Sequence, residues 1–291
     1  MSFQLIFQTV IPVFLIILVG YIIGRFKKIN IQPMIDLIVY IAGPCLIFSS
    51  ISRSDIDLAD FFTIALSAAG VILILAFLVF VILKAVKSER AGLYLPMTIG
   101  NTGYIGYPVA LFAFGIAGLS RAVVYDMIGS LFLYSLGIYI IHHKNELKEI
   151  FKVPLIYAVV IGLLFGLLKI PVPEIIFKPV EMIGMVTIPL ALLILGYKLT
   201  EIKISSAKTA AFASLFKILG GFLAALLIVK IFSISGLARN IILLQAAMPS
   251  AVMSMILTAK YNRDAELVAS VVLITTVLSI FTIPLILWYL G

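Results

Sequence analysis

Two short stretches of this sequence combine polar side chains with residues that interrupt helices. The first begins at Gly100 and reads Gly-Asn-Thr-Gly-Tyr-Ile-Gly-Tyr-Pro; the second begins at Gln245 and reads Gln-Ala-Ala-Met-Pro-Ser. Glycine and proline are poor material for a continuous helix. Both stretches lie inside long apolar segments, where broken backbone is tolerated only if it lines a cavity or is buried in protein. A half-helix that begins at such a break offers free N–H groups and a positive dipole end, which suits an anion.

The side chains at the two breaks are therefore candidate ligands for an anion. Asn101 is the first choice, because its amide both donates and accepts hydrogen bonds. The alternative is a pair of proline kinks with glycines at close helix contacts, in which Asn101 only caps a helix or bonds a neighbouring one. The predicted substrate-binding residues are Gly100, Asn101, Thr102, Pro108, Gln245, Pro249, Ser250 and Ser254.

Three further residues are candidates for ion coupling: Asp126, Ser130 and Lys217. A carboxylate within an apolar span is costly and indicates a functional site. Asp126 could bind H⁺ or Na⁺, with Ser130 one turn later; the alternative is an acid that stays wet beside Arg121. Lys217 could attract an anion or balance a carboxylate; the alternative is a side chain that reaches out to the cytoplasmic surface.

The composition indicates what surrounds these residues. Of the 291 residues 63% are apolar and 12% are charged, against about 45–50% and 25% in soluble domains. An apolar excess of this size must face lipid, which excludes a soluble enzyme, a disordered chain and a secreted disulfide scaffold. The single cysteine, Cys45, permits no internal disulfide and no cysteine metal cluster. The net charge of +8 forms no basic stripe for nucleic acid, and no cofactor or metal motif is present.

Apolar stretches between charges and turn residues predict an all-α, polytopic membrane protein with ten transmembrane helices. The predicted spans are 4–24, 32–52, 61–83, 91–114, 122–142, 153–169, 175–197, 209–229, 238–259 and 266–289. The two breaks fall in the fourth and ninth spans. The first eight residues lack the basic region and cleavage site of a signal peptide, so we expect the first span to be retained.

The distribution of Lys and Arg predicts the orientation. One set of loops carries 14 of these residues, Lys144, Lys148 and Lys152 included, and the opposite set carries 6. Cytoplasmic loops are enriched in Lys and Arg. This predicts a multi-pass protein of the plasma membrane with both termini outside.

The two halves repeat a pattern of proline and glycine. Pro12, Gly20 and Gly24 recur 142 residues later as Pro154, Gly162 and Gly166. Five spans in each half force the halves to insert with opposite topology, a common plan of secondary transporters. We predict a first five-helix repeat over 1–142 and a second, inverted repeat over 153–291. Interrupted spans at matching positions are also the best sequence indicator of a transporter's binding site.

At these residues the sequence resembles the auxin efflux carrier family, which includes the plant PIN carriers and prokaryotic relatives. Its fourth-span pattern stands here as Asn101, Thr102, Gly106 and Pro108, and its ninth-span pattern as Gln245-Ala246-Ala247 and Pro249. The resemblance runs the length of the chain and includes the seventh-span stretch from Gly184 to Gly196. Gly100 and Ser254 replace prolines of the plant carriers, and the long plant cytoplasmic loop is absent, since only 143–152 joins the halves.

The resemblance implies the crossover fold shared with bile-acid/sodium symporters and sodium/proton antiporters, in which spans 4 and 9 cross at mid-membrane. It also implies a scaffold and a moving transport subdomain in an elevator cycle, and a homodimer. Family substrates are organic anions, from indole acetate to dicarboxylates such as malonate. The departures weaken the expectation of auxin itself and leave the fold intact.

The function predicted is export of a small, auxin-like or dicarboxylate-like weak acid by a secondary transporter, with no enzymatic activity and no cofactor beyond coupling Na⁺ or H⁺. The alternative is a Na⁺- or H⁺-coupled organic-anion symporter or a sodium/proton antiporter of the same fold. An antiporter is expected to carry an acidic pair at the crossing, and neither break contains one. A membrane-embedded enzyme needs a nucleophile–base or paired-acid set, and no recognised spacing provides it. A receptor or structural role remains open at this stage.

Overall fold

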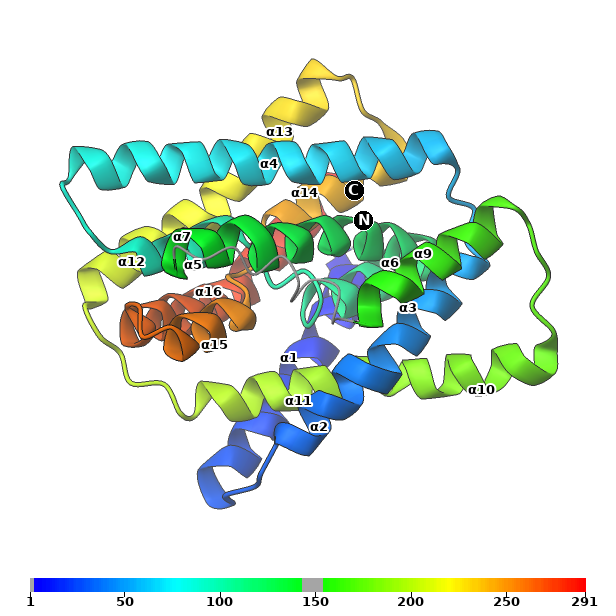
Figure 1. Cartoon of the computed structure of the whole chain (residues 1–291), viewed down its shortest axis with the longest axis horizontal. Coiled ribbons are helices and arrows are strands. Elements are labelled where there is room, and N and C mark those ends of the chain that lie inside the picture. Colours follow the sequence, from blue (N-terminus) through cyan, green and yellow to red (C-terminus); the bar gives the residue numbers. More distant parts are fainter. Residues whose placement is uncertain (1–2, 143–153) are drawn as a thin grey trace.

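The computed structural model describes residues 3–142 and 154–291, and within these ranges the chain is helical apart from its connections and one isolated β-bridge. Figure 1 shows the helices packed in a bundle, with α4 running along one side of it. The predicted link 143–152 and its three lysines lie outside the described residues. In the first half the elements are α1 (Phe3–Phe26), α2 (Gln32–Leu37), η1 (Ile38–Ala42), α3 (Gly43–Ser52), α4 (Leu58–Ala85), η2 (Ala91–Leu93), α5 (Tyr94–Thr98), α6 (Gly106–Phe132), η3 (Leu133–Gly137) and α7 (Ile138–His142). In the second half they are α9 (Pro154–Leu167), α10 (Glu174–Met185), α11 (Thr187–Leu199), α12 (Ala207–Leu215), η4 (Phe216–Gly220), α13 (Gly221–Ile231), α14 (Gly236–Ala246), α15 (Val252–Lys260) and α16 (Ala265–Leu290).

Seven stretches of helix are long and apolar enough to cross a membrane, which confirms an all-α polytopic membrane protein. They are Phe3–Phe26, Gln32–Ser52, Leu58–Ala85, Gly106–His142, Glu174–Leu199, Ala207–Ile231 and Ala265–Leu290. The other predicted spans are short or broken: α9 has 14 residues, α14 has 11 and α15 has 9. The stretch Gly106–His142 is interrupted at Gly115, where φ is 68° and ψ is −163°, between the predicted spans 4 and 5. The count of ten therefore stays a prediction.

Helices α1 and α11 pack closely because each places a glycine at the contact. A Cβ added at Gly20 would lie 2.2 Å from the carbonyl oxygen of Leu193, and one at Gly196 would lie 1.9 Å from that of Ile17. Only glycine permits this approach of two backbones. Small residues at helix contacts are typical of membrane bundles, where packing rather than the hydrophobic effect holds helices together.

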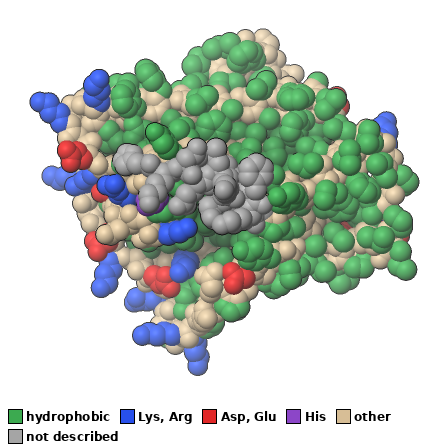
Figure 2. Space-filling view, in the orientation of Figure 1, with side chains coloured by type: hydrophobic (Ala, Val, Ile, Leu, Met, Phe, Trp, Pro, Cys, Tyr) green, Lys and Arg blue, Asp and Glu red, His purple; other side chains and the backbone are tan. Residues whose placement is uncertain are grey.

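The surface of the bundle is apolar over most of its extent. Large side chains such as Leu66, Phe77 and Trp288 are exposed, and Figure 2 shows apolar side chains covering the middle and right of the molecule. Lys and Arg side chains gather at the left end in this view, and few lie at the right end. An apolar belt of this kind suits the hydrocarbon core of a bilayer.

Candidate substrate and ion site

Two extended segments pair where the helices break. Residues 99–105 join α5 to α6, and residues 247–251 join α14 to α15. The N–H of Asn101 donates to the carbonyl oxygen of Pro249 at 2.6 Å, and that of Ala251 donates to the carbonyl oxygen of Ile99 at 3.1 Å. These two bonds flank an antiparallel bridge between Gly100 and Ser250. We call this pairing the crossing; each segment satisfies part of the other's free backbone, as buried irregular backbone requires.

The two half-helices that leave the crossing differ in what they offer a ligand. In α6 the first N–H groups are already used, because Gly106 donates to the carbonyl oxygen of Asn101 and Tyr107 donates to that of Gly103. In α15 the first N–H groups, at Val252 and Met253, have no acceptor among the described residues. The free positive helix end at this site is therefore that of α15, whereas the sequence predicted one at each break.

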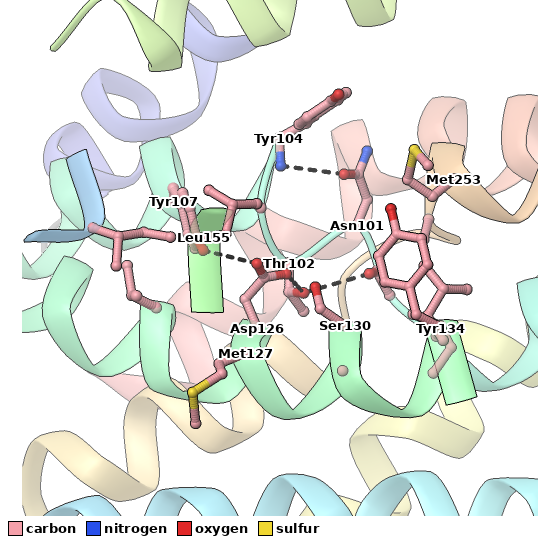
Figure 3. A pocket seen from close by; sticks show the side chains of 18 of the residues that line it. Asn101, Thr102, Tyr104, Tyr107, Asp126, Met127, Ser130, Tyr134, Leu155 and Met253 are labelled. Carbon is pink, nitrogen blue, oxygen red and sulfur yellow. Dashed lines mark hydrogen bonds between the residues drawn. The ribbon is translucent and has the colours of Figure 1, made fainter. Parts of the chain in front are cut away.

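A cavity of about 140 Å³ lies against the crossing. Figure 3 shows its side chains converging from the first crossing segment, from α6, from α9 and from the start of α15. Aliphatic side chains of η1 and α9, such as Val39 and Leu155, form much of its wall. Its polar and aromatic lining comprises Asn101, Thr102, Tyr104, Tyr107, Asp126, Ser130 and Tyr134.

Asn101 has an unused hydrogen-bond donor at this cavity. Its Oδ1 accepts from the N–H of Tyr104 at 3.2 Å, which fixes the orientation of the amide. Its Nδ2 is buried and has no partner among the described residues. An unpaired buried donor is costly, so this group is suited to a ligand that accepts hydrogen bonds. Capping alone, the alternative role of Asn101, uses only its oxygen.

Asp126 faces the crossing from α6. Its carboxylate accepts hydrogen bonds from the hydroxyl of Thr102 and, at 2.7 Å, from the hydroxyl of Tyr107, as Figure 3 shows. The alternative placed this acid beside Arg121, but Arg121 instead pairs with Asp60 at 2.5 Å. Ser130 lines the same cavity one turn further along α6.

Lys217 lies behind the crossing and does not reach the surface. Its side chain is 1% exposed, and its Nζ donates to the carbonyl oxygen of Ala246 at 3.0 Å. The expectation that it extends to the cytoplasmic surface is therefore wrong, because Lys217, in the π-helical turn η4, is buried inside the bundle. Gln245 is fully buried beside it, and both atoms of its amide lack partners among the described residues.

Of the other predicted residues, Gly100 lines the main cavity and the rest do not. Ser250 is held in place: its hydroxyl donates to the carbonyl oxygen of Pro96 and its N–H donates to the hydroxyl of Thr275. Ser254 is buried with its hydroxyl unpaired among the described residues. The structure thus brings Gly100, Asn101, Thr102, Asp126 and Ser130 together at the cavity and places Gln245, Lys217, Pro108, Pro249, Ser250 and Ser254 around the crossing away from it.

The tyrosines at the cavity were missed by sequence reasoning. Tyr134 follows Asp126 by eight residues, close to two helical turns, so it shares the face of Asp126 and Ser130. That spacing could have identified it. Tyr104 and Tyr107 belong to the first break stretch, 100–108, but the prediction considered only its small, amide, hydroxyl and proline residues as ligands.

Comparison with known proteins finds similarity to membrane transporters. Residues 5–150 and 143–287 match a family model described as "Membrane transport protein". An uncharacterized transporter of Methanocaldococcus jannaschii is 31% identical, over 97% of this chain and 98% of its own. An uncharacterized transporter of Methanothermobacter thermautotrophicus is 28% identical, over 96% of each chain.

Proposed function

The chain belongs to the membrane transport protein family, that of the auxin efflux carriers, and from this premise we propose that it is a secondary transporter of a small organic anion. The observation that carries the proposal is the unpaired, buried Nδ2 of Asn101, a residue that lines the cavity beside the crossing. The relatives are named only as transporters, so the substrate class rests on the cavity.

Three features of the cavity support an anion with an apolar part. The amide N–H of Asn101 and the first N–H groups of α15 offer donors to a carboxylate. Among the described residues that line the cavity, no Lys or Arg side chain competes for that position. The aliphatic wall and three tyrosines suit the remainder of a weak acid.

We propose that Asp126 binds the coupling ion. Its carboxylate and the hydroxyls of Thr102 and Ser130 provide hard oxygen atoms for Na⁺, and the carboxylate alone suffices for H⁺. The second candidate is an uncoupled carrier, in which the membrane potential drives export: one charge is worth about 2.3 kcal/mol per 100 mV, and a negative interior favours exit of an anion. The uncoupled carrier is favoured if Asp126 binds no cation and the hydrogen bonds from Thr102 and Tyr107 serve only to stabilise its carboxylate.

The wider organisation is proposed as well: a five-plus-five inverted repeat, an elevator cycle, a homodimer and a plasma-membrane location with both termini outside. The basic end of the molecule in Figure 2 supports a consistent orientation of the bundle. The paired breaks at the crossing support two related halves.

The proposed site is tested by a thermal-shift screen of organic acids against the purified protein in detergent. A carboxylate that raises the melting temperature of the wild type is expected to lose at least tenfold in affinity with Asn101→Ala, since a hydrogen bond to a charged group contributes about 1.5–3 kcal/mol. The matched control is Asn30→Ala, an exposed asparagine outside the site. Acids that bind both variants equally well would argue against the crossing.

A further inference from the structure

Two charged side chains flank the first crossing segment from opposite sides. A Cβ added at Gly100 would lie 3.5 Å from Nζ of Lys217, and one added at Gly103 would lie 3.5 Å from Oδ2 of Asp126. The two glycines are three residues apart, so at most about 11 Å of backbone separates them. The ammonium and the carboxylate therefore act on the same few peptide groups.

The position of Lys217 is set by the end of a half-helix. Its Nζ donates to the carbonyl oxygen of Ala246, the last residue of α14, where the helix dipole is negative and stabilises a cation. No carboxylate lies within ion-pair distance of it among the described residues. Asp126, which lies beside the same crossing segment at Gly103, is a candidate to balance its charge.

The substrate cannot contact Lys217. A second cavity, lined by Lys217, Gln245 and Thr102, has a volume of about 10 Å³, close to the least that holds one water molecule. A carboxylate does not fit there, and Lys217 does not line the main cavity. Any effect of its charge on an anion in the main cavity must pass through the crossing segment as an electric field.

We propose that Lys217 supplies the positive charge by which the crossing selects anions, and that cation binding at Asp126 releases this charge. The inference rests on the proposed function. With Asp126 ionised, the charges of Lys217 and Asp126 offset each other. When Na⁺ or H⁺ neutralises Asp126, the charge of Lys217 is left unbalanced in a medium of low dielectric constant, and an anion in the main cavity restores the balance. The cation therefore binds first and the anion second, and Lys217 acts as a positioning residue.

Other titratable groups near the pair are tyrosines of the described chain. Tyr125 lines the small cavity beside Lys217, and Tyr104, Tyr107 and Tyr134 line the main cavity beside Asp126. All four are phenols that stay neutral near pH 7 in their ordinary form. The charge balance at the crossing is therefore between Lys217 and Asp126.

The first test compares charged ligands with uncharged analogues of the same shape. Isothermal titration of the full-length protein uses indole-3-acetate against indole-3-acetamide, and malonate against malonamide. Lys217→Met, which keeps an unbranched side chain, is expected to lower the preference for the carboxylate over its amide about tenfold, and to leave amide binding unchanged. Lys217→Arg is expected to keep most of the preference. The matched control, Lys230→Met, removes an exposed charge from α13 and is expected to change nothing.

A preference that survives Lys217→Met unchanged overturns the inference while leaving the proposed function standing. If the wild type binds none of the four probes, the result speaks against the proposed function for these acids, and the second test, on cation binding, decides the inference.

In the second test, the melting temperature is measured against NaCl concentration, with choline chloride as the control for ionic strength, and against pH. Removal of the Lys217 charge is expected to lower the concentration of Na⁺ or H⁺ at half-effect several-fold, and Asp126→Asn is expected to abolish the effect. Equal midpoints in wild type and Lys217→Met, or no effect of either cation on the wild type, overturn the inference.

Discussion

Asp126 is the one carboxylate among the described residues that line the cavity. Hydrogen bonds from Thr102 and Tyr107 orient its carboxylate toward the crossing. Both donors come from the first break and its half-helix, so occupation of the carboxylate by a cation alters the bonds that hold the crossing segment. At the scale of single residues, the proposed coupling between ion and substrate therefore depends on the hydrogen bonds of Asp126 with Thr102 and Tyr107.

Asp126→Asn is expected to abolish the dependence of organic-anion uptake on a Na⁺ or pH gradient, because the amide keeps the shape of the side chain without its charge. Uptake into proteoliposomes is measured with and without each gradient. Asp36→Asn, an exposed acid on α2, serves as the control. Gradient stimulation that persists in Asp126→Asn would contradict the assignment of the coupling ion to Asp126. If a gradient does not stimulate uptake by the wild type, the uncoupled carrier is favoured instead.

Sequence reasoning identified several cavity residues but not the side of the crossing on which each lies. Asn101, predicted as a substrate ligand, and Asp126, predicted as an ion-coupling residue, line the same cavity. Gln245 was expected to contact the same ligand, and the structure places it behind the segment with Lys217. Polar and charged side chains in an apolar span can be recognised from the sequence because they are costly in lipid. The side of the crossing segment that each one faces depends on the rotation of its helix, which the sequence does not give. Lys217 lies in the π-helical turn η4, and such a turn leaves no clear mark in the sequence.

At the scale of elements, long apolar helices were predictable and their interruptions only partly so. The spans predicted at 4–24 and 266–289 correspond to α1 and α16 within a few residues, because uninterrupted apolar length decides them. The two breaks were predictable from glycine and proline. The interruption at Gly115, where the backbone leaves helical geometry, falls between the predicted spans 91–114 and 122–142, in agreement with the sequence.

Gly196→Ala is expected to destabilise the contact between α1 and α11 by about 1–3 kcal/mol, because its Cβ would overlap the carbonyl oxygen of Ile17 and the backbone must shift. Thermal melting in detergent measures the loss. The matched control is Gly220→Ala, whose Cβ would meet only side-chain atoms within 4 Å, namely Leu75 Cδ2 at 3.3 Å and two ring atoms of Phe216 at 3.7 Å. Equal melting temperatures for Gly196→Ala and the wild type would show that the two helices do not rely on this contact.

At the scale of the whole molecule, corresponding parts of the two halves have corresponding contacts. Gly20 of α1 meets Leu193 of α11, and its counterpart Gly162 of α9 meets Ile51 of α3. At the crossing, Thr275 lies 25 residues after Ser250 and accepts its N–H, as Asp126 lies 25 residues after Asn101. These parallels support the proposed inverted repeat. They also show where the halves differ: α16 places a hydroxyl, Thr275, where α6 places a carboxylate.

The central claim is that an organic anion binds in the cavity beside the crossing. The most direct measurement is anomalous X-ray diffraction from crystals grown with 4-bromophenylacetate, with Asn101→Ala crystals as the control. We expect a bromine peak inside the cavity, near Met127 and Tyr134, that is lost in the variant. A peak confined to the apolar groove between α1 and α16, lined by Leu18 and Leu273, or a cavity peak that is unchanged in Asn101→Ala, would contradict the account.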